Sequence, residues 1–118
     1  MPDRPTFTKS PPELVARFDE VAARFPEADR RKMFGYPALF VGGNLVTGLF
    51  ADAWMIRLPD EARNELLALP GASDFEVMPG RVMKGYATLP QDLVADDGRL
   101  DAWVRRALEY GMTLPPKK

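Results

Sequence analysis

Three short apolar runs separated by tight turns, between residues 38 and 58, constrain the fold of this chain most strongly. The runs are residues 38–41, 45–50 and 53–58, and short turns over 42–44 and 51–52 join them. Strands of about five or six residues joined by turns of two or three residues form an antiparallel meander. The middle of the chain is therefore predicted to be a sheet of neighbouring strands, which the flanking segments must cover.

The helical period replaces this pattern near the start of the chain. Between Leu14 and Phe25 the apolar residues recur at spacings of three and four, which places them on one stripe of a helix. We expect Ser10 to cap this helix, because its hydroxyl can accept a hydrogen bond from a free N–H of the first turn. Pro26 ends the helix, and residues 27–36 are predicted to form a polar connector to the sheet.

Further helices and strands are predicted in the second half of the chain. They are a helix over 59–69, strands over 74–78 and 82–89, a helical turn over 91–94, and a helix from Asp96-Asp97 to about Tyr110. Asp96 and Asp97 offer an N-cap to the last helix, and Gly111 is expected to stop it.

The predicted order of the main elements is α-β-β-β-α-β-β-α. Two layers satisfy it, an antiparallel sheet and helices packed against that sheet. A chain of 118 residues has the usual size of one domain. We therefore expect a single α+β domain over residues 10–112, with a flexible arm over 1–9 and a flexible tail over 113–118.

The chain has no cysteine and no histidine. This excludes disulfides, thiolate nucleophiles, Cys/His zinc sites and histidine-based triads. Lys and Arg number 16 and Asp and Glu number 17, so the net charge is −1, which argues against a surface that is basic overall. The N-terminus has no apolar signal region, and no stretch has the apolar length of a membrane span. We expect a cytoplasmic protein without membrane contact.

No motif for a cofactor, a metal or a catalytic group stands out. Residues 80–85 lack the Ser or Thr that follows the lysine of a phosphate-binding loop. Asp96-Asp97-Gly98 lacks the further ligand spacing of a calcium loop, so a helix cap explains it better. We expect no catalytic residue, no cofactor and no metal site, and hence a protein that is not an enzyme.

The basic and aromatic cluster that begins at Arg30 is the strongest candidate for a binding surface. Arg31 and Lys32 continue it, and Phe34 and Tyr36 follow. Positive charge beside aromatic rings suits an anionic partner, either protein or nucleic acid. The alternative is that the rings pack into the core while the charges are merely solvated. We expect Phe34 to be largely buried.

Both faces of the predicted meander are apolar. Leu45 and Leu49 point to one side of their strand, and Val46 and Phe50 point to the other. Three helices in a two-layer fold should cover mainly one face, which would leave apolar side chains open on the other. We therefore expect a symmetric homodimer that closes the uncovered face. Helices on both faces are the alternative.

An ordered set of motifs resembles the N-terminal domain of the TfoX/Sxy family. The motifs are Lys32-Met33-Phe34-Gly35, residues 39–44, Arg57-Leu58-Pro59, residues 75–81, Met83-Lys84-Gly85-Tyr86, Leu89-Pro90 and the terminal helix with Trp103. The resemblance extends over residues 12–112. It implies a two-layer α+β domain similar to the secretion-chaperone-like fold. It also implies a relationship to regulators of DNA uptake competence, which act with a transcription factor, and it brings no catalytic residue.

The leading hypothesis is a non-enzymatic interaction domain that is linked to transcription through protein contacts. Direct nucleic-acid binding through the basic cluster at 30–36 is one alternative, which the net charge of −1 disfavours. The other is a small-ligand binder or an enzyme that uses Arg57, Lys84, Tyr86 and Glu76. The candidate partner-binding residues are Arg30, Arg31, Lys32, Tyr36, Arg57, Lys84 and Tyr86.

Overall fold

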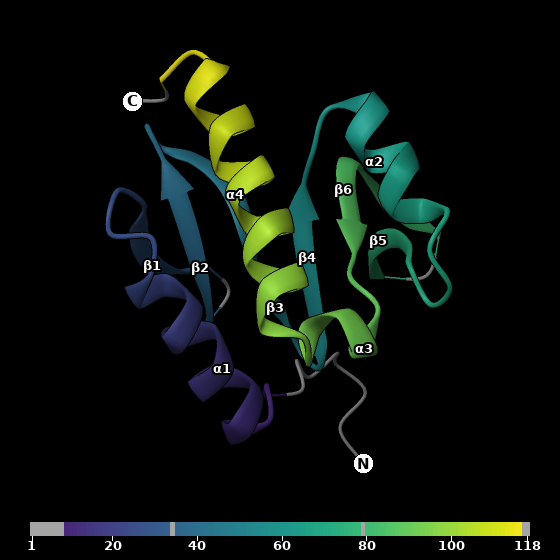
Figure 1. Cartoon of the computed structure of the whole chain (residues 1–118), viewed down its shortest axis with the longest axis horizontal. Helices are drawn as coiled ribbons and strands as arrows, with labels where there is room; N and C mark the ends of the chain where they lie inside the picture. The colour runs from purple at the N-terminus through teal and green to yellow at the C-terminus, as the bar shows by residue number, and fades with distance from the viewer. Residues whose placement is uncertain (1–8, 34, 79, 117–118) are drawn as a thin grey trace.

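The structure, a computed structural model, describes residues 9–33, 35–78 and 80–116. Its elements are α1 (Pro12–Ala23), β1 (Asp29–Met33), β2 (Tyr36–Val41), β3 (Asn44–Phe50), β4 (Ala53–Arg57), α2 (Asp60–Leu67), β5 (Ser73–Met78), β6 (Arg81–Thr88), α3 (Gln91–Val94) and α4 (Asp97–Thr113). In these residues the strands form one antiparallel sheet in the order β1-β2-β3-β4-β6-β5 (Figure 1). The α+β class and the predicted order of the main elements are confirmed, with β1 as an additional strand.

Strand β1 lies in the segment that was predicted to be a polar connector. It pairs with β2 in a register that runs from Asp29 opposite Phe40 to Met33 opposite Tyr36. Hydrophobic periodicity could not indicate this strand, because four of its five residues are charged and those four are exposed. Pairing with the more buried strand β2 determines its conformation, rather than any apolar content of its own.

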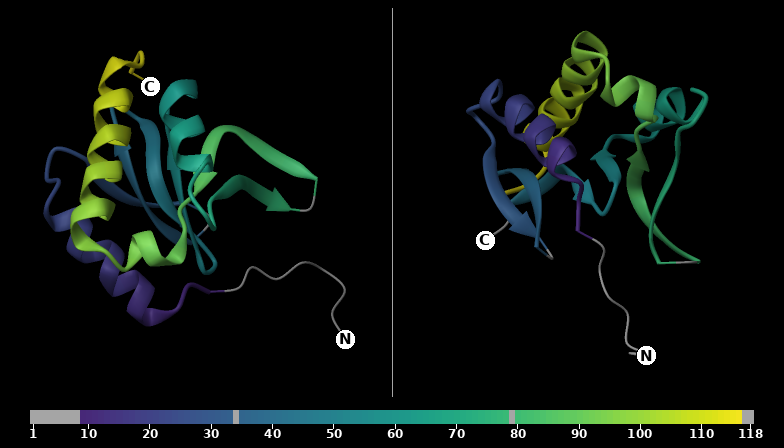
Figure 2. Two further views of the ribbon diagram at one scale, coloured as in Figure 1. Left: turned by 45° about the vertical axis from the view of Figure 1, so that its right-hand side comes forward. Right: turned by 90° about the horizontal axis from the view of Figure 1, so that it is seen from below.

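The helices of the described part lie on one face of the sheet, as the right-hand view of Figure 2 shows. They bury the main core, in which Phe18 of α1, Trp54 of β4 and Leu100 of α4 are almost inaccessible to solvent. The ring centroids of Phe18 and Trp54 lie 5.0 Å apart. The indole N–H of Trp54 donates to the hydroxyl of Thr47 at 2.8 Å. The two-layer arrangement is confirmed.

The opposite face carries a smaller apolar cluster, over which the described residues place no helix. The outer strands bend away from the helices, so this face is concave (Figure 2). The ring of Phe50 lies 5.2 Å from Tyr36 and 5.6 Å from Phe75, centroid to centroid, and Met55 of this cluster is fully buried. The homodimer was predicted because one face of the sheet was expected to expose apolar side chains. In the structure, the bend of the sheet buries most of these side chains within one chain. Self-association stays a prediction.

A bend in β6 adds to this curvature. Strand β6 pairs with β4 only through residues 86–88 in the described structure, and its register with β5 shifts between Asp74 and Glu76. Gly85 has a φ of +88° here, a left-handed conformation that glycine adopts without the strain of a side chain. The remainder of the β5–β6 hairpin therefore projects from the body as an arm (Figure 2, left).

Helix α4 extends beyond its predicted end near Tyr110 and continues to Thr113. Gly111 therefore lies inside the helix and does not stop it. A Cβ atom at Gly111 would lie 2.5 Å from Cγ1 of Val46 and 3.5 Å from Cβ of Val41. The absence of a side chain thus lets α4 approach β2 and β3 closely.

The two predicted helix caps have different outcomes. Asp96 caps α4 as predicted, because its side chain accepts a hydrogen bond from the N–H of Arg99 at 3.1 Å. Ser10 does not cap α1. Its hydroxyl donates instead to the carbonyl of Ala51 at 2.6 Å, which links the start of α1 to the β3–β4 turn. Phe34, which was expected to be buried, lies outside the described residues.

Candidate functional site

Strand β1 is an open edge of the sheet, because in the described residues it pairs with β2 on one side and with no strand on the other. Lys32 of this strand lies opposite Pro37. Pro37 has no N–H, so these two residues cannot exchange the two hydrogen bonds of a bonded pair. The alternate pairs of an antiparallel ladder turn their N–H and C=O groups outward. Lys32 therefore directs its main-chain polar groups to the open edge.

The side chains of β1 are divided between the two faces of the sheet. Arg30 lies on the helix side, where its Nε donates to Oδ1 of Asp19 on α1 at 2.7 Å. Arg31 lies on the concave side, with its guanidinium 5.7 Å from the ring centroid of Phe40 and 3.5 Å from the carboxylate of Asp29. Arg30, Arg31 and Lys32 are all exposed. The strand thus presents consecutive positive charges along a main chain whose outer side has no partner strand in the described residues.

Tyr36, which was grouped with these basic residues, is only 5% exposed. It lies opposite Met33 in the ladder and packs against Phe50. The ring of Tyr36 is therefore part of the interior. Of the cluster's described residues that were proposed to bind a partner, the three basic ones are exposed.

Arg57, Lys84 and Tyr86 form a second group towards the other edge of the sheet. Arg57 lies opposite Tyr86 in the ladder, and its guanidinium is 5.6 Å from the centroid of the tyrosine ring. Burial raises the pKa of Tyr86 above its usual value, and the charge of Arg57 opposes this rise. Lys84 is exposed and lines a cavity of about 300 Å³ together with Asp60 and Asp74. The structure thus separates the seven predicted residues into two groups.

The β5 edge of the sheet differs in charge from the β1 edge. Asp74 and Glu76 are both exposed on β5. One edge of the sheet is therefore basic and the other acidic.

In the described ranges, no group of three or more acidic side chains is placed to hold a metal ion. No helix in those ranges combines the length and the apolar character needed to cross a bilayer.

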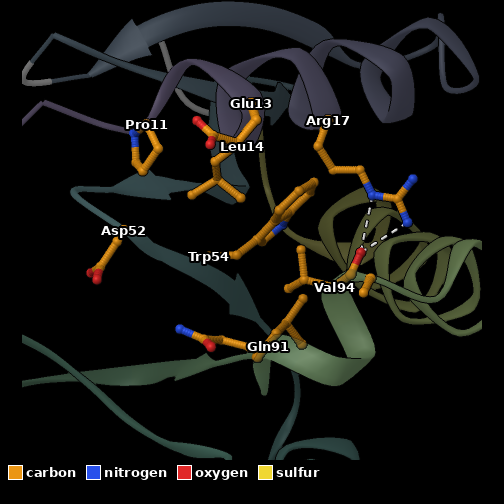
Figure 3. A pocket seen from close by; sticks show the side chains of 10 residues that line it. Pro11, Glu13, Leu14, Arg17, Asp52, Trp54, Gln91 and Val94 are labelled. Carbon is orange, nitrogen blue, oxygen red and sulfur yellow. Dashed lines mark hydrogen bonds between the residues drawn. The ribbon is translucent and has the colours of Figure 1, made fainter.

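A cleft that the sequence did not indicate lies between the start of α1, the start of β4 and α3 (Figure 3). Its volume is about 580 Å³. We call it the Trp54 cleft, after the indole at the centre of its lining. The lining comes from residues 11–17, 52–54 and 89–95, which are far apart in the sequence, so no local pattern could have indicated it.

These observations define a small α+β domain with an open basic edge strand and a cleft that three distant segments line. The sequence profile of the TfoX N-terminal domain matches residues 19–110, and the chain belongs to this family. The resemblance that the motifs indicated is thereby confirmed. Neither the curated proteins nor the solved structures include a significant match.

Proposed function

We propose that this domain is a non-enzymatic protein-interaction module that binds an extended acidic segment of a partner along β1. The open edge of β1 carries the proposal, because Arg30, Arg31 and Lys32 are exposed there in succession. A peptide that pairs with such an edge gains main-chain hydrogen bonds, and its alternate side chains provide specificity. The partner segment becomes a seventh strand of the sheet.

The charges of β1 select the partner and also protect the edge. Edge strands that carry Lys and Arg resist pairing with the same strand of a second copy, because like charges repel. An acidic strand removes this repulsion and adds ion pairs to Arg31 and Lys32. A homodimer joined β1 to β1 is disfavoured for the same reason. The acidic edge strand β5 of a second copy is compatible with β1, so light scattering should accompany each binding measurement.

Nucleic acid is the weaker candidate for this edge. Binding of duplex DNA rests on several phosphate contacts. Two of the three basic residues already lie near carboxylates, Arg30 near Asp19 and Arg31 near Asp29. The net charge of −1 adds no long-range attraction for a polyanion. A short acidic segment needs fewer free charges, because main-chain hydrogen bonds supply much of its affinity.

Family membership supports a narrower version of this proposal. The chain belongs to the TfoX N-terminal domain family, and the TfoX/Sxy resemblance implies a relationship to regulators that act beside a transcription factor. We therefore expect a transcription-linked partner in the cytoplasm, contacted through protein rather than through DNA. Fold alone does not carry such a role, so the partner must be identified by binding.

Fluorescence anisotropy with a labelled peptide of alternating Glu and Val tests the proposal. We expect saturable binding to the wild-type chain. The variant Arg31→Glu/Lys32→Glu should bind at least about tenfold more weakly, because attraction becomes repulsion. Lys32→Pro should also weaken binding, since it removes an outward N–H while the position tolerates proline at an edge.

The matched control is Arg81→Glu/Arg99→Glu, which changes the net charge equally at two exposed positions outside β1. It should bind the acidic peptide like the wild type. Labelled duplex DNA at two salt concentrations is the competing probe. Preference for DNA through the same residues, or an equal loss in the control variant, contradicts the proposal.

A further inference from the structure

We propose that the Trp54 cleft is a second binding site, which takes a basic and apolar segment of a partner protein. Its volume of about 580 Å³ lies in the range of ligand-binding clefts. Asp52, Leu89 and Gln91 line both this cleft and a neighbouring cavity of about 590 Å³. The two cavities are therefore neighbours that share part of their lining.

The floor of the Trp54 cleft is apolar. Figure 3 shows Trp54 at its centre, with Leu14 on one side and Val94 on another. The indole N–H is already bonded to Thr47 at 2.8 Å, and the ring is only 1% exposed, so Trp54 closes the bottom of the cleft. The half-buried side chains of Leu14 and Val94 supply the accessible apolar surface, which favours aliphatic groups.

Arg17, the basic residue of the lining, is already occupied. Its Nε and Nη2 both donate to the carbonyl oxygen of Val94, at 3.0 and 2.9 Å, as the dashed lines in Figure 3 mark. Its Nη1 pairs with Asp97 and lies 3.5 Å from Glu20. An anionic ligand would have to displace these partners, so the cleft is poorly suited to an anion.

Exposed carboxylates line the two neighbouring cavities. They belong to Glu13 and Asp52 in the Trp54 cleft and to Asp92 in the neighbouring cavity. Within the ranges that the structure describes, Glu13 and Asp52 have no ion-pair partner, and Asp92 lies 4.0 Å from Arg99. A Lys or Arg side chain that enters here meets the charges of Glu13 and Asp52, which no described residue neutralises. Together with the apolar floor, this favours a segment in which basic and apolar residues alternate.

This second site is independent of the proposed function of β1. It uses other elements and attracts a partner of the opposite charge. The acidic peptide therefore tests only β1, and a basic peptide tests only the cleft. If the acidic peptide does not bind β1, the proposal for the cleft is unaffected. If the basic peptide does not bind the cleft, the proposal for β1 is unaffected.

Tryptophan fluorescence localises binding to the cleft. The sequence has two tryptophans, and Trp103→Phe leaves Trp54 as the single reporter. We expect a peptide of alternating Lys and Leu to produce a saturable change in Trp54 emission, and the acidic peptide to produce none. In this background Glu13→Gln/Asp52→Asn should weaken binding about fivefold to tenfold, since two exposed ionic contacts are lost.

The control variant Glu27→Gln/Glu109→Gln removes the same charge at exposed positions elsewhere and should bind like the parent. An equal loss in this control, or no saturable change up to millimolar peptide, overturns the proposal. Displacement of the peptide by spermidine at equal concentration would show a site for any cation, which also overturns it. If only a variant without residues 1–8 binds the peptide, the occupant is the N-terminal segment of the chain and the assignment to a partner is wrong.

Discussion

The two faces of this sheet are closed in different ways. On one face α1, α2 and α4 pack against the sheet over Trp54, and Leu66 of α2 contributes to the main core. On the other face the described residues include no helix, and the curved sheet brings Phe50 and Phe75 together over Met55. Curvature thus buries the apolar side chains of the second face, as the layer of helices buries those of the first.

This difference explains where a partner can bind. A face that is closed within the chain offers little apolar surface for docking, and among the described residues only Val82 and Met112 are large apolar side chains that are well exposed. In the described part of the chain, the edge strand β1 and the cleft at the start of β4 remain open to a partner. Because helices cover one face and curvature buries the other, substitutions on the two faces should lower the free energy of unfolding by different amounts.

The largest effect is expected on the helix-covered face. Trp54→Ala should lower the free energy of unfolding by about 5 kcal/mol, the upper end for truncation of an aromatic core residue. The change empties a fully enclosed site and also removes the donor to the Thr47 hydroxyl. Urea unfolding followed by circular dichroism measures this loss. A loss below about 2 kcal/mol would show that the helices cover this face loosely.

A smaller effect is expected on the concave face. Phe75→Ala should cost about 3 kcal/mol, the lower end of the aromatic range, because no rigid layer prevents the neighbouring side chains from collapsing into the space. The same unfolding assay compares it with Trp54→Ala. If both substitutions cost the same, the concave face is as rigidly packed as the helix-covered one, and the distinction between the faces fails.

Gly111 tests how closely α4 approaches the sheet. Gly111→Ala should cost about 1–2 kcal/mol, because overlap with Val46 outweighs the better helix propensity of alanine. Gly98→Ala in the same helix is the control. A Cβ there would meet only the Asp96 side chain, at 3.8 Å, so this substitution should be neutral or stabilising. Equal effects at both positions contradict the close contact.

The smallest effect is a pH dependence on the concave face. Burial raises the pKa of Tyr86, so the unfolded chain loses this proton before the folded chain does. Unfolded tyrosine titrates at about pH 10. The stability due to the neutral phenol is complete below that pH and is lost as the pH rises through the higher folded pKa. Between pH 9 and 11 the free energy of unfolding, measured with urea, should fall less steeply for Tyr86→Phe than for the wild type. Parallel pH dependences of the two proteins would contradict the burial of this hydroxyl.

Much of the fold could be predicted because its signals are local. The meander over 38–58 and the helix that ends before Pro26 follow from periodicity that a window of a few residues contains. Strand β1 could not be found in this way, because its charged residues have no apolar alternation and pairing with β2 holds them in place. The role of Gly111 depends on Val46, sixty-five residues earlier in the chain.

The candidate sites show the same division. Arg30, Arg31 and Lys32 are adjacent in the sequence, so their cluster could be recognised before the strand that displays it. The burial of Tyr36 follows from the path of β2, which composition does not reveal. The Trp54 cleft combines three distant segments, and only the fold brings them together.

Amide hydrogen exchange during binding of the acidic peptide tests the central claim, that β1 accepts a seventh strand. The outward main-chain groups of β1 should become protected when the peptide binds, with the N–H of Lys32 as the clearest reporter. The amides of β5, the other edge, should exchange as before. Protection of Lys32 confined to the complex is the predicted result. Saturable peptide binding that leaves the exchange of residues 29–33 unchanged would contradict the account.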